Sequence, residues 1–441
     1  MENSEYNVRM NNSAMHNPRS ASPFGVGSEV GNLRKVLVHR PDLSLRRLTP
    51  ANHDELLFDD LLWVEHAQLE HDNFTAIMRD RGVEVYYLEQ MMVEALQAHP
   101  EAQQRMVERV ITPLTVGMSL YDELYELLLD MAPATLVRHL IGGLTKAETE
   151  AMYDLGPAEH TSLIAAASNE DTFLLPPLPN SLFTRDSSCW IYGGVTLNPM
   201  YYPARRAEAV NAALVYHYHP LFREASFEFW YPMDGRLDEY QALDFGHASM
   251  EGGDVKPIGN KAVLVGISER TSPQMIEALA ETLFARGAAE RMIACQMTRD
   301  RAHMHLDTIF TMLDRDAVTI YPKIVNQIKA YSIRPGDTAW AFDISEEKSF
   351  LHAVADALEC KKLRVIPTGG DQYRQAREQW DDGNNVVALE PGVVIAYRKN
   401  THTNQAFREA GIEVLEIDGF ELGRGRGGGH CMTCPFLRDG L

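Results

Sequence analysis

The sequence is poor in cysteine and in basic residues, and it has no long hydrophobic run. Only 5 of its 441 residues are cysteines, and their odd number and wide spacing are typical of reduced thiols rather than of a disulfide framework. No uncharged stretch approaches the roughly 20 apolar residues of a membrane span, and the start of the chain lacks the apolar core of a secretory signal. We therefore expect a cytoplasmic protein without a membrane partner.

The shortage of basic residues gives the chain a strong negative charge. Its 41 lysines and arginines stand against 62 acidic residues, for a formal net charge of -21. This charge repels nucleic acid and favours the approach of small cations, although an acidic surface often serves only solubility. The sequence also lacks a P-loop and a convincing G-x-G-x-x-G segment between a strand and a helix. We expect no nucleic-acid partner and no cofactor.

What the sequence does contain is one pattern that recurs five times. A helical stretch leads into a β-rich run at 80–88, 222–232, 284–294, 357–367 and 408–417. Hairpin-like pairs of apolar runs accompany most of these steps, with turns at Gly193-Gly194, Gly259-Asn260, Asp314 to Asp316 and Pro391-Gly392,. The run 33–41 can complete the unit that the last helix and strand begin. We predict an α/β fold whose five units close into a ring; the alternative is an open α+β sheet with chance regularity.

A helical segment interrupts this pattern. Between 89 and 165, apolar residues recur at three- and four-residue spacing, which predicts amphipathic helices,. The proline-rich stretch from Asp171 to Asn180 then ends the helices,. We expect a flexible N-terminal extension over 1–24, a catalytic domain formed by 25–88 and 166–441, and an inserted helical subdomain over 89–165.

The most unusual stretch is GRGRGGGHCMTCP at 423–435. Its glycines let the backbone approach a ligand closely. A flexible tail is one interpretation, but the segment directly follows a predicted strand. Cys431 and Cys434 form a C-x-x-C, which alone is a weak signal for a redox pair or half a zinc site. Zinc is the stronger of these alternatives, because His303 and His305 alternate along a predicted strand and could supply the remaining ligands,.

Carboxylates form the other candidate constellation. His305 and Asp307 are two residues apart on a predicted strand, so we expect both side chains on one face, and Asp186 follows a proline-rich loop,. Two carboxylates in one pocket suit a guanidinium, whose planar fork pairs with them in bidentate geometry. Glu251, in a Gly-rich loop, could orient a histidine or cap a turn. Each of these residues alone could equally be structural.

Together the motifs resemble one family. PNSLFTRD at 179–186, MEGGD at 250–254, HLDT at 305–308 and GRGGGHCMTCP at 425–435 resemble, in order and spacing, the bacterial arginine deiminases of the guanidine-modifying pentein superfamily. The resemblance extends over nearly the whole chain, including RKVLVHRPDLSLRRLTP near the N-terminus. It implies a fivefold pseudosymmetric α/β propeller with an inserted helical subdomain.

The resemblance also implies residue roles. Cys431 would be the nucleophile, His305 the proton-transfer residue and Glu251 its hydrogen-bonded partner, while Asp186 and Asp307 would hold the guanidinium of the substrate. No metal is implied. The rest of the substrate would be held by a further set of residues, Asn180, Phe183, Arg205, Arg270 and Arg426.

The chemistry expected from these roles is the hydrolysis of free L-arginine to L-citrulline and ammonia through a covalent S-alkylthiouronium on Cys431. Backbone amides, Arg426 and the substrate cation are expected to lower the thiol pKa. Arg206 adjoins Arg205, so the match at that position is the least certain. The alternatives are a related enzyme acting on another guanidine, an amidinotransferase, or the zinc-binding protein considered above. A homo-oligomer is possible.

Overall fold

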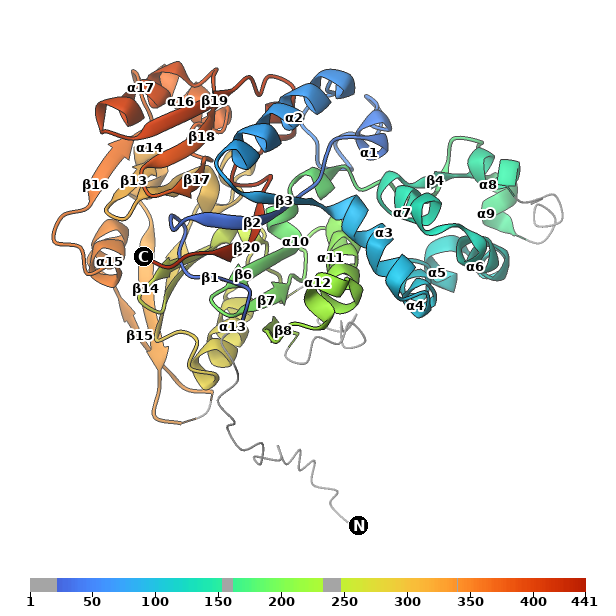
Figure 1. Ribbon diagram of the computed structural model, residues 1–441, viewed down its shortest axis with the longest axis horizontal. Helices are drawn as coiled ribbons and strands as arrows, with labels where there is room; N and C mark the ends of the chain where they lie inside the picture. Colours follow the sequence, from blue (N-terminus) through green and yellow to red (C-terminus); the bar gives the residue numbers. More distant parts are fainter. Residues whose placement is uncertain (1–21, 153–161, 233–246, 339) are drawn as a thin grey trace, which may run out of the picture.

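The computed structural model describes residues 22–152, 162–232, 247–338 and 340–441 (Figure 1). Most of the expected N-terminal extension, residues 1–21, lies outside the described residues. Within the described part, Phe24 is buried. The short strand β1 (Gly25–Val26) then pairs in parallel with β20 (Cys434–Arg438). The first described residues are therefore tied to the last strand of the chain.

Five three-stranded β-β-α-β units make up the α/β part of the fold. Each unit has an antiparallel strand pair, then a helix, then a third strand parallel to the second. A helix is a usual crossover between parallel strands, whereas a short turn can join antiparallel ones. The units are β20, β2 (Leu33–Val38), α2 (Val64–Asp80) and β3 (Glu84–Tyr87); β6 (Ser188–Ile191), β7 (Gly194–Leu197), α11 (Arg206–Tyr218) and β8 (Glu228–Tyr231); β9 (Val255–Gly259), β10 (Ala262–Ile267), α13 (Pro273–Ala285) and β11 (Arg291–Gln296); β12 (Phe310–Asp314), β13 (Ala317–Ile320), α15 (Phe350–Ala357) and β16 (Arg364–Pro367); and β17 (Val387–Glu390), β18 (Val393–Tyr397), α17 (Thr401–Glu409) and β19 (Glu413–Ile417).

The units match the recurring sequence pattern closely. The four expected turns each join an antiparallel pair, and the run 33–41 forms β2, which pairs with β20 at the far end of the chain. Turn chemistry explains one case directly: Asn260 and Lys261 both have positive φ, 49° and 53°, between β9 and β10,. Beyond the units, β14 (Lys329–Pro335) and β15 (Phe342–Glu346) extend the sheet of β11. The described chain is thus a mixed α/β fold.

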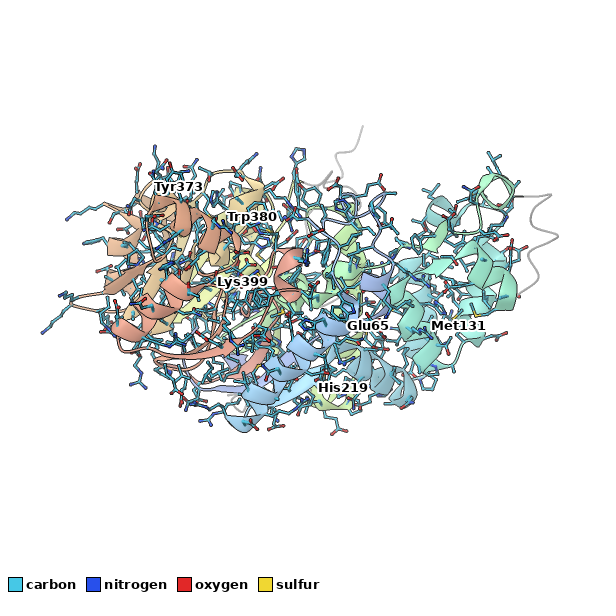
Figure 2. All side chains as sticks on the ribbon, turned by 90° about the horizontal axis from the view of Figure 1, so that it is seen from above. Glu65, Met131, His219, Tyr373, Trp380 and Lys399 are labelled. Carbon is cyan, nitrogen blue, oxygen red and sulfur yellow. The ribbon has the colours of Figure 1, made fainter. Side chains whose placement is uncertain are left out.

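Helices make up most of the described chain between β3 and β5 (Phe173–Leu175) and extend to one side of the molecule in Figure 1. Met131, in this segment, and Tyr373 lie toward opposite ends of the molecule in Figure 2. The helices share a buried cluster with α11, in which Met92 and Leu96 join Ala212 and Ala213. They are α3 (Leu88–Ala98), α4 (Glu101–Val110), α5 (Pro113–Val116), α6 (Tyr121–Asp130), α7 (Pro133–Gly142), α8 (Lys146–Met152) and α9 (Leu163–Ala167), with β4 (Leu144–Thr145) pairing β5. Whether they form a separate subdomain with the expected boundaries stays a prediction.

Short elements connect the units and carry most of the site. They are α1 (Leu43–Arg46), η2 (Pro179–Leu182), α10 (Thr184–Ser187), η3 (Pro203–Arg205), α12 (Pro220–Arg223), η5 (Gly252–Asp254), η6 (Arg301–His303), η7 (Leu306–Thr308), α14 (Pro322–Val325), α16 (Gln372–Trp380) and η8 (Leu422–Gly425). None of the helices in the described part of the chain has the length and apolarity that a membrane span requires.

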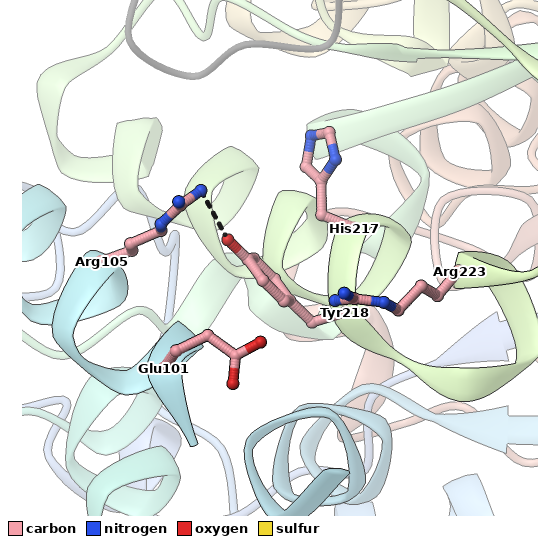
Figure 3. Close-up of a pocket in the computed structure, with 5 residues that line it drawn as sticks. All are labelled: Glu101, Arg105, His217, Tyr218 and Arg223. Atoms are coloured by element: carbon pink, nitrogen blue, oxygen red, sulfur yellow. Dashed lines mark hydrogen bonds between the residues drawn. The ribbon is translucent and has the colours of Figure 1, made fainter. Parts of the chain in front are cut away.

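A cavity of about 270 Å³ lies where α4 of the helical segment meets α11 and α12 (Figure 3). Arg105 donates a hydrogen bond to the Tyr218 hydroxyl, 3.1 Å away, and Glu101, His217 and Arg223 complete the lining. The cavity contains none of the residues for which the sequence predicts chemistry.

Candidate active site

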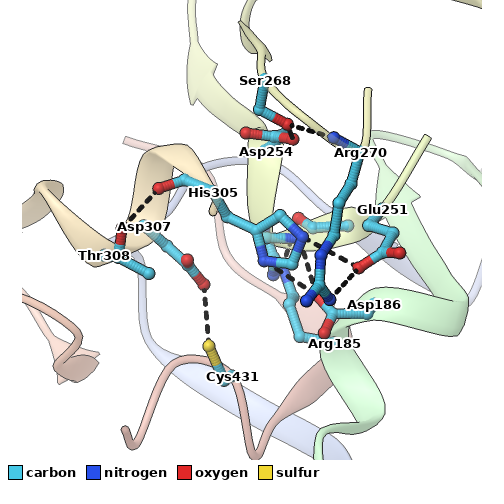
Figure 4. Close-up of polar contacts among 12 residues, drawn as sticks. Arg185, Asp186, Glu251, Asp254, Ser268, Arg270, His305, Asp307, Thr308 and Cys431 are labelled. Atoms are coloured by element: carbon cyan, nitrogen blue, oxygen red, sulfur yellow. Dashed lines mark hydrogen bonds and ion pairs between the residues drawn. The ribbon is translucent and has the colours of Figure 1, made fainter. Parts of the chain in front are cut away.

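The predicted catalytic residues come from equivalent places in four of the five units. We call the residues directly before the first strand of each unit its lead-in segment. Asp186 lies just before β6, Glu251 before β9, His305 and Asp307 before β12, and Cys431 before β20, in each case by five residues or fewer. All five side chains are at most 4% exposed. Figure 4 shows them converging in one buried cluster.

His305 faces two carboxylates. Its Nε2 atom lies 2.9 Å from Oε2 of Glu251, and its Nδ1 atom lies 3.7 Å from Oδ1 of Asp186. Burial, the largest single effect, lowers the pKa of the imidazole, but the nearby carboxylates, Asp186 and Glu251 foremost, outweigh it and raise the pKa to about 9,. His305 is therefore an imidazolium at neutral pH and can donate a proton.

The HLDT segment is not a strand, which corrects the sequence-based prediction. Leu306–Thr308 form the 3-10 turn η7, and Asp254 caps it, because Oδ1 of Asp254 accepts a hydrogen bond from the Leu306 amide at 2.8 Å. As a consequence His305 and Asp307 do not share a strand face. His305 meets Glu251, whereas Asp307 meets the cysteine (Figure 4). The two side chains still reach one site, but they contact different partners in it.

Two arginines pair with the same carboxylates. Nη1 of Arg205 lies 2.8 Å from Oδ2 of Asp186 and 3.1 Å from Oε2 of Glu251, and Nη1 of Arg270 lies 3.0 Å from that Glu251 oxygen. Burial tends to raise the pKa of Glu251, but Arg270 and Arg205 outweigh it and hold that pKa well below the usual range. Glu208, on α11, anchors Arg205 from the other side at 2.8 Å. In this structure, the guanidinium groups of Arg205 and Arg270 therefore pair with Asp186 and Glu251. The sequence-based prediction assigns these two carboxylates to substrate binding and catalysis.

Cys431 lies between an acceptor and a donor. Its Sγ atom is 3.3 Å from Oδ2 of Asp307 and 3.0 Å from Nδ2 of Asn385. Burial and the neighbouring carboxylates, Asp307 foremost, raise the thiol pKa well above its usual value. The expectation that backbone amides and Arg426 lower this pKa is therefore wrong, since burial and the carboxylates outweigh them at the sulfur.

The remaining substrate-binding candidates form a more scattered set. Asn180 donates to the Leu56 carbonyl at 2.7 Å, and Phe183 stacks on Phe58 with ring centroids 6.1 Å apart. Arg426 has a φ of 62° and stacks over Trp380, with its guanidinium carbon 3.5 Å from the ring centroid. Arg426 therefore contacts a different group of residues from Arg205 and Arg270.

The ambiguity between the two adjacent arginines has a clear structural answer. Arg205 is 1% exposed and reaches the carboxylates of the site, whereas Arg206 is exposed. Arg205 ends the short turn η3 and Arg206 begins α11. Of the two, only Arg205 is placed where it can take part in the site's chemistry.

The four proposed zinc ligands do not converge. His303 lies on η6, half-buried, and stacks on Tyr321 with centroids 5.8 Å apart. Cys434 points away into the core, where its thiol donates to the Ser188 carbonyl at 3.4 Å. Within residues 22–152, 162–232, 247–338 and 340–441, the group of side chains with metal-ligand spacing is Asp186, Glu251 and His305, and arginines already pair with both carboxylates. The geometry gives the zinc alternative no support.

Sequence reasoning missed a buried network behind Asp307. His430 bridges Oδ2 of Asp307 and Oε2 of Glu29, each at 2.8 Å. Nζ of Lys256 lies 3.2 Å from Nε2 of His430, and Arg185 pairs with Glu29 at 2.9 Å. The position of His430 next to Cys431 was a usable signal. Single charges within strand-like or loop segments, such as Lys256 and Glu29, carry no such signal.

We expect the Glu251→Gln substitution to lower the pKa of His305 by about 1 to 2, because it removes the charge of one of the carboxylates that stabilise the imidazolium. NMR titration of the histidine side chains measures this value directly. Glu269→Gln is a matched control, since Glu269 bonds Tyr202 instead of His305 and should leave the value near 9.

The same pKa has a consequence for stability. Because the His305 pKa is raised from 6.5 to about 9 in the folded protein, its protonation adds stability that is fully present below about pH 6.5 and is lost as the pH rises through about 9. Glu251→Gln should weaken this pH dependence. An unchanged His305 titration in that variant would contradict the pairing.

Comparison with known proteins gives the family of the chain. A sequence model described as arginine deiminase matches residues 54–438. Among solved structures, the chain is similar to SxtG, an amidinotransferase from Microseira wollei in the saxitoxin biosynthetic pathway. That similarity has 14% identity and a TM-score of 0.53, and it covers 95% of this chain and 98% of the other.

A dimethylarginine dimethylaminohydrolase aligns over 92% of this chain and 100% of its own, at 13% identity and a TM-score of 0.48. At such identities a structural likeness shows only that the fold is shared. The sequence match is more specific, because it spans most of the chain and includes every residue of the cluster that the sequence had predicted. The chain belongs to the arginine deiminase family.

Proposed function

We propose that this protein hydrolyses free L-arginine to L-citrulline and ammonia, with Cys431 as the nucleophile. The observation that carries the proposal is the position of the Cys431 sulfur 3.3 Å from the carboxylate of Asp307, in a buried site that also holds a protonated histidine. A guanidinium is a poor electrophile, so it needs a strong nucleophile and carboxylates that fix its plane. The cluster offers both.

Binding of the substrate cation would change the protonation of the thiol. Burial and the nearby carboxylates raise the pKa of the Cys431 thiol and keep it neutral. A guanidinium held by Asp307 and Asp186 would offset their charge, lower the thiol pKa and allow the proton to leave to solvent. To receive this cation, Asp186 would have to exchange its contact with Arg205. Arg205 would keep its contacts with Glu208 and Glu251, and its Nη1 group would then be available to the carboxylate end of the substrate.

The chemical steps follow from the groups in the cluster. The Cys431 thiolate attacks the guanidinium carbon and gives a tetrahedral adduct. The His305 imidazolium protonates the departing nitrogen, ammonia leaves, and a planar S-alkylthiouronium remains. His305, now neutral, takes a proton from water as the water adds to the same carbon. As this second adduct collapses, its hydroxyl proton leaves to solvent, the thiolate is expelled and citrulline is released.

The proposal extends to the architecture. Five equivalent β-β-α-β units whose lead-in segments meet in one cluster support a fivefold pseudosymmetric α/β propeller, with the helices of 89–165 as an inserted subdomain. The pairing of β2 with β20 would close the ring, because it joins strands from opposite ends of the chain.

Cys431→Ser should fold but lose activity by about 1000-fold or more, because a serine hydroxyl is scarcely ionised and the adjacent Asp307 carboxylate is too weak a base to deprotonate it,. Cys434→Ser is the matched control and should remain active, since Cys434 contacts Ser188 and Tyr216 rather than the site. Citrulline formation measures both. The same assay after exhaustive chelation should show full activity; stoichiometric zinc whose removal abolishes turnover would overturn the thiol mechanism.

Specificity for arginine should depend on Arg426. Its Nε and Nη1 atoms are buried and have no hydrogen-bond partner within the described residues, so they are available to the α-carboxylate. Arg426→Ala should lower kcat/KM for arginine by about 30-fold or more, and turnover of agmatine, which lacks that carboxylate, should change much less. Steady-state kinetics on both substrates measure the difference.

Arg424→Ala is the control for this prediction, because Arg424 is a partly exposed arginine of the same loop that pairs with Asp60. Arg424→Ala should leave kcat/KM unchanged for both arginine and agmatine. An equal proportional loss on arginine and agmatine in Arg426→Ala would assign Arg426 to the fold or to the thiolate. Arg270 makes a less clean test, because it also holds Glu251.

A further inference from the structure

Asn385 places a fixed hydrogen-bond donor on the nucleophilic sulfur. Its Nδ2 atom lies 3.0 Å from Sγ of Cys431, and the residue is 1% exposed. The oxygen and nitrogen of an amide have similar shapes, so a network must decide which one faces the sulfur. Here two backbone amides decide it. Oδ1 of Asn385 accepts from the N–H groups of Gly428, at 3.1 Å, and of Cys431, at 3.0 Å.

The Asn385 N–H favours a negative charge on the sulfur, whereas the carboxylates around the sulfur disfavour it. Asp307 accepts a hydrogen bond from the thiol and repels a thiolate. Asp186 and Asp382 add to the negative field at the sulfur, and the buried Lys256 is a positive group that acts in the opposite direction. Asn385 is neutral and contacts the sulfur directly. An amide N–H binds a thiolate more strongly than a thiol, because hydrogen bonds to charged acceptors are the stronger ones.

The position of Asn385 in its unit is equivalent to the positions of the predicted catalytic residues in theirs. It lies in the lead-in segment of the unit that begins with β17. The lead-in segments of the other four units each supply a residue of the predicted set. No sequence motif includes Asn385, so the residue that this unit supplies to the site is identified only from the structure.

We propose that Asn385 is a catalytic residue that holds the Cys431 thiolate through its side-chain N–H. It does so when the thiolate attacks the substrate and again when the thiolate is expelled. The role rests on the proposed function, since it assigns Cys431 as the nucleophile. The Asn385 contact favours the thiolate over the thiol, whereas the carboxylates of the site favour the neutral thiol.

Two substitutions test the role. Asn385→Asp keeps an oxygen for the two backbone amides but replaces the donor with a second acceptor. Asn385→Ala removes the donor without adding charge. Asn384→Asp is the matched control, because Asn384 is equally buried in the same turn but bonds Thr319 at 2.7 Å and Thr368 at 2.8 Å instead of the sulfur. Thermal unfolding identifies the folded variants, and if Asn385→Asp does not fold, Asn385→Ala decides.

The primary measurement is the rate at which neutral iodoacetamide alkylates Cys431 as a function of pH, with the alkylated site identified by mass spectrometry. This measurement needs no arginine. We expect the apparent thiol pKa to rise by about 1 to 2 in Asn385→Ala and further in Asn385→Asp, and kcat/KM for arginine to fall by about 10- to 100-fold. Asn384→Asp should alkylate like the wild type.

The outcomes separate the two proposals. A wild-type alkylation profile in folded Asn385→Ala would overturn the role of Asn385, as would an equal shift in Asn384→Asp. If the pKa shifts as expected but the wild-type protein produces no citrulline from arginine, the proposed function fails, while the donor to the thiolate stands.

Discussion

A single carboxylate oxygen of Glu251 holds three cationic side chains together in the candidate active site. Oε2 of Glu251 lies 2.9 Å from His305, 3.1 Å from Arg205 and 3.0 Å from Arg270, and the residue is fully buried. A buried charge costs several kcal/mol unless it is paired, and removing one partner from such a pair typically costs about 3 to 5 kcal/mol. The loops that carry these cations are therefore held in place by the carboxylate they share. Asp186 and this contact with Glu251 together keep His305 protonated, so the arrangement that stabilises the site also prepares its acid.

The charges near Cys431 are less completely balanced than those around Glu251. Asp382 is buried, and neither of its carboxylate oxygens has a hydrogen-bond partner within the described residues. Burial, the main cause, raises its pKa to about 7 despite the opposing charge of Arg426. Arg426 in turn has unpaired nitrogen atoms. Unpaired buried groups of both signs are costly, and sites of function are where proteins commonly retain them. A zwitterion with a cationic side chain would satisfy both, which agrees with a free amino acid as the proposed ligand.

The sequence predicted the parts of this structure that depend on local pattern. Turn residues and apolar runs located the strand pairs, because alternation and turn chemistry act over a few residues. The resemblance of the motifs to a known family identified Cys431 and His305 as candidates, and both lie in the buried cluster of the candidate active site. It could not give the 3-10 turn after His305, since that turn depends on a cap from Asp254, 52 residues away. Asn385 and Lys256 were missed for the same reason: each matters only through partners that the fold brings from elsewhere in the chain.

The positions of the candidate residues are set by the strand pairs that follow them. Each lead-in segment ends at the first strand of its unit, so its side chains are held by a buried antiparallel pair and still project into the shared centre. The same segments also take part in the apolar packing, since Cys431 lies in a buried cluster with Val36 and Val387, and Leu306 lies in another with Phe310. The spacing between nucleophile, acid and carboxylates is then set by how the five units pack against one another. The residues that would perform the chemistry are therefore also held by the core, and a substitution among them is expected to affect both the reactivity of the site and the packing around it.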